Sequence, residues 1–193
     1  SSNQVKNGLW FREKNRGFEI EGKTVAILGM GNTGKNFAKK ISSFNCKVVF
    51  YDINEKIESK YAKKTSLDFL YKNADIVSLH LPFTTTTTDL FNKEFIQKFD
   101  KPFWFINTSR GKIVNTPDLV DALNEKKILG AGLDVIDIES SSFNNIEKEL
   151  NPYFYELINL KNVIITPHIA GWTFESNVKL SQIIIDKIET YFK

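Results

Sequence analysis

The chain of 193 residues has room for one domain, or for one domain and a small second one. Its hydrophobic fraction of 41% is ordinary for a globular protein. Its formal charge of +3 comes from scattered lysines with no basic run among aromatic residues, which argues against a nucleic-acid partner. No apolar run reaches transmembrane length, the first residues lack a signal-peptide pattern, and the single cysteine, Cys46, excludes an internal disulfide and fits a reducing compartment. These features predict a soluble, cytoplasmic protein with neither nucleic acid nor a membrane as a partner.

Residues 1–20 are a polar lead-in with isolated apolar positions. A short helix is expected over 3–12, although Gly8 weakens it. Trp10 and Phe11 need a surface to cover them, which is either the rest of this domain or a second subunit.

The segment 24–40 predicts a strand, a glycine-rich turn and a helix over 33–44. In the run Gly29-Met30-Gly31-Asn32-Thr33-Gly34, the first glycine permits a tight turn and the second lets the backbone approach a pyrophosphate. The third allows the helix to pack closely on the strand. The helix N-terminus then offers N–H groups and the positive end of its dipole to phosphates.

A second strand, 47–52, ends at Asp52, about twenty residues after the turn. A carboxylate there can accept hydrogen bonds from both hydroxyls of an adenosine ribose, and it repels a 2′-phosphate. The pattern therefore favours NAD over NADP. The alternative is a βαβ turn that binds nothing, with Asp52 as a solvated charge at the end of a strand.

The rest of the chain continues to alternate apolar strands with helices. Strands are expected at 75–80, 103–107, 128–134 and 162–166, a weak helical piece at 54–63, an irregular piece at 138–145, and helices at 146–158 and 173–191. Ser66 and Asn92 are expected to cap two further helices, and Thr116 is expected to cap a third, with Pro117 at its first position. The nearly all-apolar strand 103–107 predicts burial on both faces. The last helix places Leu180, Ile184, Ile188 and Tyr191 on one face.

This alternation predicts a doubly wound α/β domain with a mostly parallel sheet, in which ligands bind beyond the carboxyl ends of the strands. Each unusual polar motif of the chain follows a predicted strand. The motifs are Gly29 to Gly34, Asp52, His80-Leu81-Pro82, Asn107 to Gly111, Asp134 to Glu139, and Thr166 to Gly171. We therefore expect them all at one edge of the sheet.

Three side chains at this edge suit chemistry on an organic acid. The planar guanidinium of Arg110 matches a carboxylate or a 2-oxo acid, with a salt bridge at a strand end as the alternative. His168 can exchange a proton near neutral pH, with a hydrogen-bonded structural histidine as the alternative. Glu139 can orient an imidazole beside it, although alone it is simply a loop acid. His80 is expected to be structural and to line a cofactor cleft at most, and the threonine run 84–88 to be a polar loop.

Taken in order, the motifs GxGxxG, strand-end Asp, HLP, NTSRG, DV followed by Glu, and TPHIAGW resemble the D-isomer-specific 2-hydroxyacid dehydrogenases. The nearest subgroup is the phosphoglycerate dehydrogenase-like members. The resemblance covers Gly22 to about Ile185 and implies hydride transfer between NAD and a D-2-hydroxy acid or its 2-oxo acid. It implies that Arg110 binds the substrate and that His168 is the general acid/base. It also implies that Glu139 pairs with His168, while Asp134 holds the nicotinamide carboxamide.

Motifs and resemblance together give the predicted site, which contains no metal ligands. The catalytic set is Arg110, Glu139 and His168. The cofactor-binding set is Gly29, Gly31, Asn32, Thr33, Gly34, Asp52, His80, Leu81, Pro82, Thr87, Thr108, Ser109, Asp134, His168 and Gly171. Family proteins often have proline after the catalytic glutamate, whereas this chain has Ser140, so Asp137 is a minor rival for the acid role.

Family enzymes have a coenzyme domain and a substrate domain. This chain is expected to be a single NAD-binding domain over 1–193, with 1–20 as its lead-in and without the substrate domain. It is expected to bind NAD, to turn over little or nothing alone, and to form a homodimer through coenzyme domains. Two alternatives are a non-catalytic NAD sensor or co-repressor-like module, and an NADP-dependent glyoxylate or hydroxypyruvate reductase.

Overall fold

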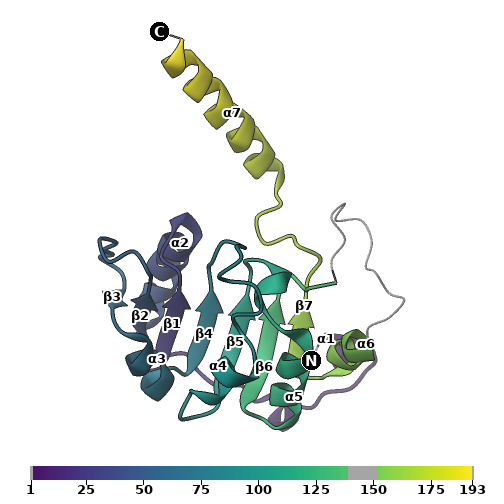
Figure 1. Ribbon diagram of the computed structural model, residues 1–193. Coiled ribbons are helices and arrows are strands. Elements are labelled where there is room, and N and C mark those ends of the chain that lie inside the picture. Colours follow the sequence, from purple (N-terminus) through teal and green to yellow (C-terminus); the bar gives the residue numbers. More distant parts are fainter. Residues whose placement is uncertain (1, 139–151, 193) are drawn as a thin grey trace.

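A computed structural model describes residues 2–138 and 152–192, which contain one parallel sheet flanked by helices (Figure 1). The strands are β1 (Thr24–Leu28), β2 (Lys47–Tyr51), β3 (Lys63–Lys64), β4 (Ile76–Leu79), β5 (Phe103–Asn107), β6 (Ile128–Leu133) and β7 (Val163–Ile165). Their order is β3-β2-β1-β4-β5-β6-β7, and every pairing is parallel. The strand order therefore reverses at β1, which confirms the doubly wound fold.

The helices connect these strands. They are α1 (Ser2–Lys6), α2 (Asn32–Ile41), α3 (Leu67–Asn73), α4 (Lys93–Gln97), α5 (Thr116–Asn124), α6 (Pro152–Asn159) and α7 (Phe174–Tyr191), with short 3₁₀ turns at Glu13–Asn15, Ser42–Phe44 and Gly111–Ile113. The expected caps are confirmed for α3 and α4, because the side chains of Ser66 and Asn92 accept hydrogen bonds from backbone N–H groups in the first turn. The cap of α5 is Asn115, whose side chain accepts from the N–H of Asp118. Thr116 is the first helical residue and not the cap.

Two apolar layers hold the sheet. On one face α3 to α6 pack over a core rich in phenylalanine, in which the rings of Phe91 and Phe105 stack with centroids 4.1 Å apart. On the other face α2 packs over β1 and β2 through a smaller cluster that includes Met30 and Phe50. The carboxyl edge of the sheet, where the motifs lie, is thus supported from both sides.

The predicted helical piece at 54–63 is wrong. The segment forms turns and the short edge strand β3. Side-chain oxygens of Asn54 and Ser59 accept hydrogen bonds from the backbone N–H groups of Lys56 and Tyr61, two residues further on. Such local bonds compete with the helical pattern, which explains the difference.

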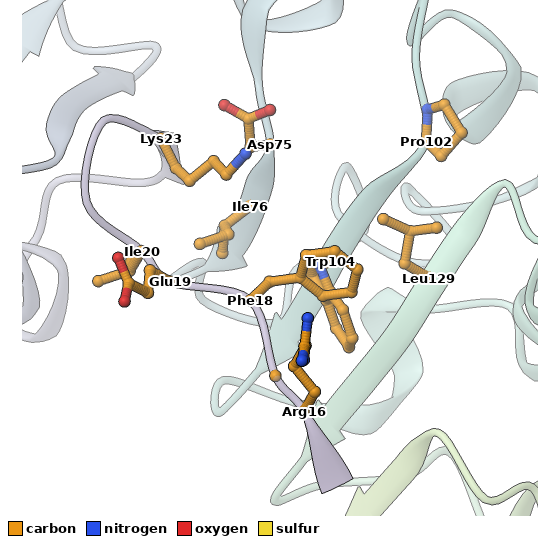
Figure 2. A pocket seen from close by; sticks show the side chains of 11 residues that line it. Arg16, Phe18, Glu19, Ile20, Lys23, Asp75, Ile76, Pro102, Trp104 and Leu129 are labelled. Atoms are coloured by element: carbon orange, nitrogen blue, oxygen red, sulfur yellow. The ribbon is translucent and has the colours of Figure 1, made fainter. Parts of the chain in front are cut away.

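Strand β5 is not buried on both faces as expected, because Trp104 is 37% exposed. Phe18 of the lead-in partly covers it, with ring centroids 6.3 Å apart. Both side chains line a cavity of about 480 Å³. Figure 2 shows them together with Arg16 and Leu129, which also line it. Of the predicted site residues that the structure describes, none lines this cavity.

The last helix, α7, extends away from the sheet (Figure 1), and none of its residues is buried. The predicted apolar face is therefore uncovered: Leu180, Ile184 and Ile188 are all exposed. At the other end of the chain, the helix expected over 3–12 is limited to α1, followed by a 3₁₀ turn. Among the helices that the structure describes, none combines the length and the apolar character that crossing a membrane requires.

Candidate functional site

Six strands end in one row across the sheet. The paired end residues are Tyr51 with Leu28, Leu28 with Leu79, Leu79 with Asn107, Asn107 with Leu133, and Leu133 with Ile165. The residues next in the chain are Asp52, Gly29, His80, Thr108, Asp134 and Thr166. The motifs therefore begin at a single edge of the sheet, because the strands that precede them end in register.

The glycine turn has the geometry that its sequence predicts. Gly29 has φ +91°, and a Cβ there would lie 2.5 Å from the carbonyl oxygen of His80. A Cβ at Gly34 would lie 2.2 Å from the carbonyl oxygen of Gly29, so only glycine lets α2 approach the strand this closely. A Cβ at Gly31 would meet no atom of residues 2–138 or 152–192 within 4 Å, so this position is open on the side of the described residues. Asn32 and Thr33 begin α2, and among the described residues no side chain caps its N-terminus.

The carboxylate of Asp52 stabilises the glycine turn by accepting hydrogen bonds. Its Oδ2 accepts a hydrogen bond from the N–H of Met30 at 2.7 Å, and its Oδ1 accepts one from the N–H of Asn54 at 2.8 Å. The carboxylate is thereby fixed beside the glycine turn, where an acceptor for ribose hydroxyls is expected.

A largely apolar cavity of about 610 Å³ opens beside the turn. It is lined by Leu28, Gly29, Gly31, Tyr51, Asp52, Ile53, Asn54, Ile57, Leu67, His80, Leu81, Pro82, Thr84, Thr86, Thr87, Leu90 and Phe95. Seven of the predicted cofactor residues are among them: Gly29, Gly31, Asp52, His80, Leu81, Pro82 and Thr87. Sequence reasoning missed the apolar wall of Ile57, Leu67, Leu90 and Phe95. These residues lie on separate segments and carry no motif.

His80 and Thr87 shape the cavity. The Oγ of Ser78 lies 2.9 Å from Nε2 of His80, and the imidazole packs on Phe37 with centroids 5.0 Å apart. Burial lowers the pKa of His80 to about 4, so the ring is neutral near pH 7, as suits a structural histidine. The hydroxyl of Thr87 accepts from the N–H of Thr84 and donates to the carbonyl oxygen of Pro82, which holds the threonine loop in shape.

The NTSRG turn is organised by a buried asparagine. Oδ1 of Asn107 accepts from the N–H and the hydroxyl of Ser109, at 3.0 and 2.7 Å, and its Nδ2 donates to the carbonyl oxygen of Arg110. Thr108 and the side chain of Arg110 are exposed on this turn. The guanidinium donates to the carbonyl oxygen of Ser109 at 2.6 Å, and no carboxylate of the described residues forms an ion pair with it.

His168 lies in the loop after β7, and this loop is tied to Asp134. Asp134 is 5% exposed, and its carboxylate accepts from the hydroxyl of Thr166 and from the N–H groups of Ile169 and Ala170. Its carbonyl oxygen accepts the N–H of His168 at 2.8 Å. The loop is thus fixed by one buried residue of the neighbouring strand end, and Gly171 follows it in the open.

The two carboxylates considered for the acid role differ in what the structure says of them. Glu139 lies outside the described residues. Burial raises the pKa of Asp137, and a hydrogen bond with Thr116 offsets part of that rise. Asp137 also packs by its backbone against Gly111, where a Cβ would lie 2.5 Å from its nitrogen. Asp137 is therefore only partly engaged at the start of α5, because its Oδ1 is buried and has no hydrogen-bond partner among the described residues.

Comparison with known proteins identifies this arrangement. Residues 1–170 match the family model described as "D-isomer specific 2-hydroxyacid dehydrogenase, NAD binding domain". A glyoxylate reductase of Thermofilum pendens is 36% identical over 187 residues, which are 93% of this chain and 52% of that protein. A D-lactate dehydrogenase of Streptococcus pyogenes is 39% identical over 166 residues, 83% of this chain and 50% of that protein.

The likeness extends to solved structures. The NAD-complexed D-isomer specific 2-hydroxyacid dehydrogenase from Lactobacillus delbrueckii ssp. bulgaricus has a TM-score of 0.85 and 31% identity, over 99% of this chain and 61% of that one. The chain spans about half the length of these curated relatives. It belongs, as an NAD-binding domain, to the D-isomer specific 2-hydroxyacid dehydrogenase family.

Proposed function

We propose that this chain binds NAD along the carboxyl edge of its sheet and forms the cofactor-binding part of an enzyme that interconverts a D-2-hydroxy acid and its 2-oxo acid. The observation that carries the proposal is the single row of strand ends. This row brings the glycine turn and Asp52 onto the same edge as the loops of Arg110 and His168.

The residues present fit the dinucleotide. The open position at Gly31 leaves room for a pyrophosphate beside the uncapped N-terminus of α2, which supplies the positive end of a helix dipole. The apolar cavity suits an adenine, and Asp52 stands at its rim for the ribose hydroxyls. The proposed binding set is the one that the motifs predict, with the apolar wall of the cavity added.

The proposed chemistry uses three side chains. When bound, the nicotinamide accepts or gives a hydride. Arg110, which no described carboxylate neutralises, would hold the substrate carboxylate by paired N–H donors. His168 would take the hydroxyl proton during oxidation and return it to the carbonyl oxygen during reduction, and Glu139 would orient it.

Cofactor binding can be tested on this chain by titration calorimetry. We expect NAD to bind, and the absence of heat at millimolar NAD would contradict the proposal. We expect Asp52→Ala to raise the Kd for NAD by about 10- to 100-fold, the loss of charge-assisted hydrogen bonds, while Asp121→Ala on the exposed side of α5 leaves it unchanged.

The ratio of NAD to NADP affinity distinguishes two roles of Asp52, contact with the ribose and support of the glycine turn. If the carboxylate contacts the ribose, Asp52→Ala shifts preference toward NADP. If it only braces the turn, both cofactors weaken equally and the ribose contact is misassigned.

The substrate and the assembly are the finer parts of the proposal. We infer a reductase of small 2-oxo acids, with the phosphoglycerate dehydrogenase-like members as the nearest subgroup, and a homodimer through coenzyme domains. A panel of 3-phosphoglycerate, hydroxypyruvate, glyoxylate and pyruvate with the complete gene product decides the substrate. We expect little turnover from this chain alone, because it spans about half the length of the relatives that it matches and the reaction needs a closed, water-poor cleft.

A further inference from the structure

Thr166 makes a short contact across the sheet edge. It is the first residue after β7, and its hydroxyl donates to Oδ1 of Asp134 at 2.5 Å. A hydroxyl bound to a carboxylate at this length is a charge-assisted hydrogen bond. Its acceptor is 5% exposed, so water does not compete for it freely.

The carboxylate that Thr166 holds in turn holds the loop of His168. Oδ1 of Asp134 also accepts from the N–H of Ile169 at 2.9 Å, and Oδ2 accepts from the N–H of Ala170 at 2.8 Å. Both oxygens must face the loop at once, which fixes the rotation of the carboxylate. The hydroxyl of Thr166 is the third donor to this carboxylate.

His168 needs such support because its backbone is in the left-handed region, with φ +56°. This conformation is uncommon and unfavourable for a residue with a side chain. It persists here because the N–H of His168 donates to the carbonyl oxygens of Asp134 and Thr166, at 2.8 and 3.0 Å. The backbone position from which the imidazole projects therefore depends on these contacts.

We propose that Thr166 is a positioning residue for His168 and that it acts through the carboxylate of Asp134. The inference rests on the proposed function, in which His168 moves a proton. Asp134 would serve the loop in this way whether or not it also holds the nicotinamide carboxamide.

Thr166→Val removes the hydroxyl while keeping the branched shape. The N–H of Thr166 donates to the carbonyl oxygen of Leu133 at 2.9 Å, so the backbone stays anchored to β6 in the variant. Thr166→Ser restores the hydroxyl. Thr190→Val in α7 is the matched control, because it removes an exposed hydroxyl that donates only to the carbonyl oxygen of Asp186.

In the complete enzyme, we expect Thr166→Val to lower kcat by about tenfold with the Kd for NAD within twofold of wild type. We expect the pH dependence of kcat/KM to shift, because the environment of the proton-transferring imidazole changes. Thr166→Ser should recover most of the loss and Thr190→Val should show none. An unchanged kcat and pH profile in Thr166→Val, or a Thr166→Ser variant no better than Thr166→Val, would overturn the proposal.

A second measurement, on this chain, distinguishes a failure of the positioning role from a failure of the proposed function. Amide hydrogen exchange at Ile169 and Ala170 should be about tenfold faster in Thr166→Val, with exchange in β6 unchanged. Unchanged exchange rates at both amides would contradict the positioning role of Thr166. Faster exchange in an enzyme with no activity on any 2-oxo acid supports the contact and counts instead against the proposed function.

Discussion

Asp52 and Asp134 each use a side chain at a strand end to hold a loop of the candidate site. Asp52 accepts from the N–H of Met30 in the glycine turn, and Asp134 accepts three donors from the loop after β7. A carboxylate can do this while a lone pair stays free for a ligand, since each oxygen accepts two hydrogen bonds. Local support and the proposed ligand contact would therefore coincide at single residues.

His80 gives a pH-dependent stability at the residue scale. Its folded pKa of about 4 lies below the ordinary 6.5, so between these values the unfolded chain binds more protons than the folded one. The contribution of His80 to the free energy of unfolding is therefore fully present above about pH 6.5. It falls by on the order of 3 kcal/mol as the pH decreases toward about 4.

The measurement is urea unfolding at pH 7, 6, 5 and 4. We expect His80→Gln to be less sensitive to pH over this window than wild type, because glutamine takes up no proton there. Equal pH slopes for the two proteins would show that His80 does not titrate as its burial implies.

At the scale of elements, two glycines of the turn between β1 and α2 have different surroundings. Gly34 has backbone within 2.2 Å of where a Cβ would be, whereas Gly31 has nothing within 4 Å. Gly34 serves packing, so a side chain there affects the stability of the folded chain even without a ligand. Gly31 is proposed to serve the ligand, so a side chain there would matter only when the pyrophosphate is bound.

Alanine at the two positions should separate stability from binding. We expect Gly34→Ala to lower Tm by about 5–10 °C, because overpacking against backbone costs about 1–3 kcal/mol. Gly31→Ala should leave Tm within about 2 °C of wild type and raise the Kd for NAD at least about tenfold. Differential scanning calorimetry and NAD titration of both variants check this, and a Gly31→Ala variant with wild-type affinity would contradict it.

Short-range signals predicted the elements well where the partner is close in sequence. The caps at Ser66 and Asn92 act within three residues and were read correctly. The prediction of a helix over 54–63 was wrong because the side chains of Asn54 and Ser59 accept hydrogen bonds from nearby backbone N–H groups. The spacing of apolar residues does not indicate such local bonds. At α5 the cap moved by one residue to Asn115, within the usual uncertainty of a helix boundary.

At the scale of the whole molecule, large apolar side chains stay uncovered at both ends of the described chain. Trp10 in the lead-in is 81% exposed, and the 18-residue helix α7 buries no residue. Patches of this kind mark contact surfaces. They fit the proposed homodimer.

We expect this chain to dimerise and Trp10→Ala to weaken the dimer at least about tenfold, as truncation of an aromatic anchor does. Sedimentation velocity over a concentration series measures it. Trp172→Ala is the matched control, because Trp172 is 69% exposed but lies in the loop after His168. A wild-type chain that stays monomeric at every concentration, or equal weakening by both variants, would rule out the lead-in as the interface.

The sequence by itself determined the doubly wound fold and the edge at which the motifs meet, because strand-turn-helix alternation and glycine spacing are local and periodic. Tertiary structure alone decided the apolar wall of the cavity and the bond between Thr166 and Asp134, whose residues lie 32 apart in sequence. It also decided that α7 has no covering surface within the described residues. Contacts between distant segments depend on how strands align in register, and no short window of residues encodes that alignment.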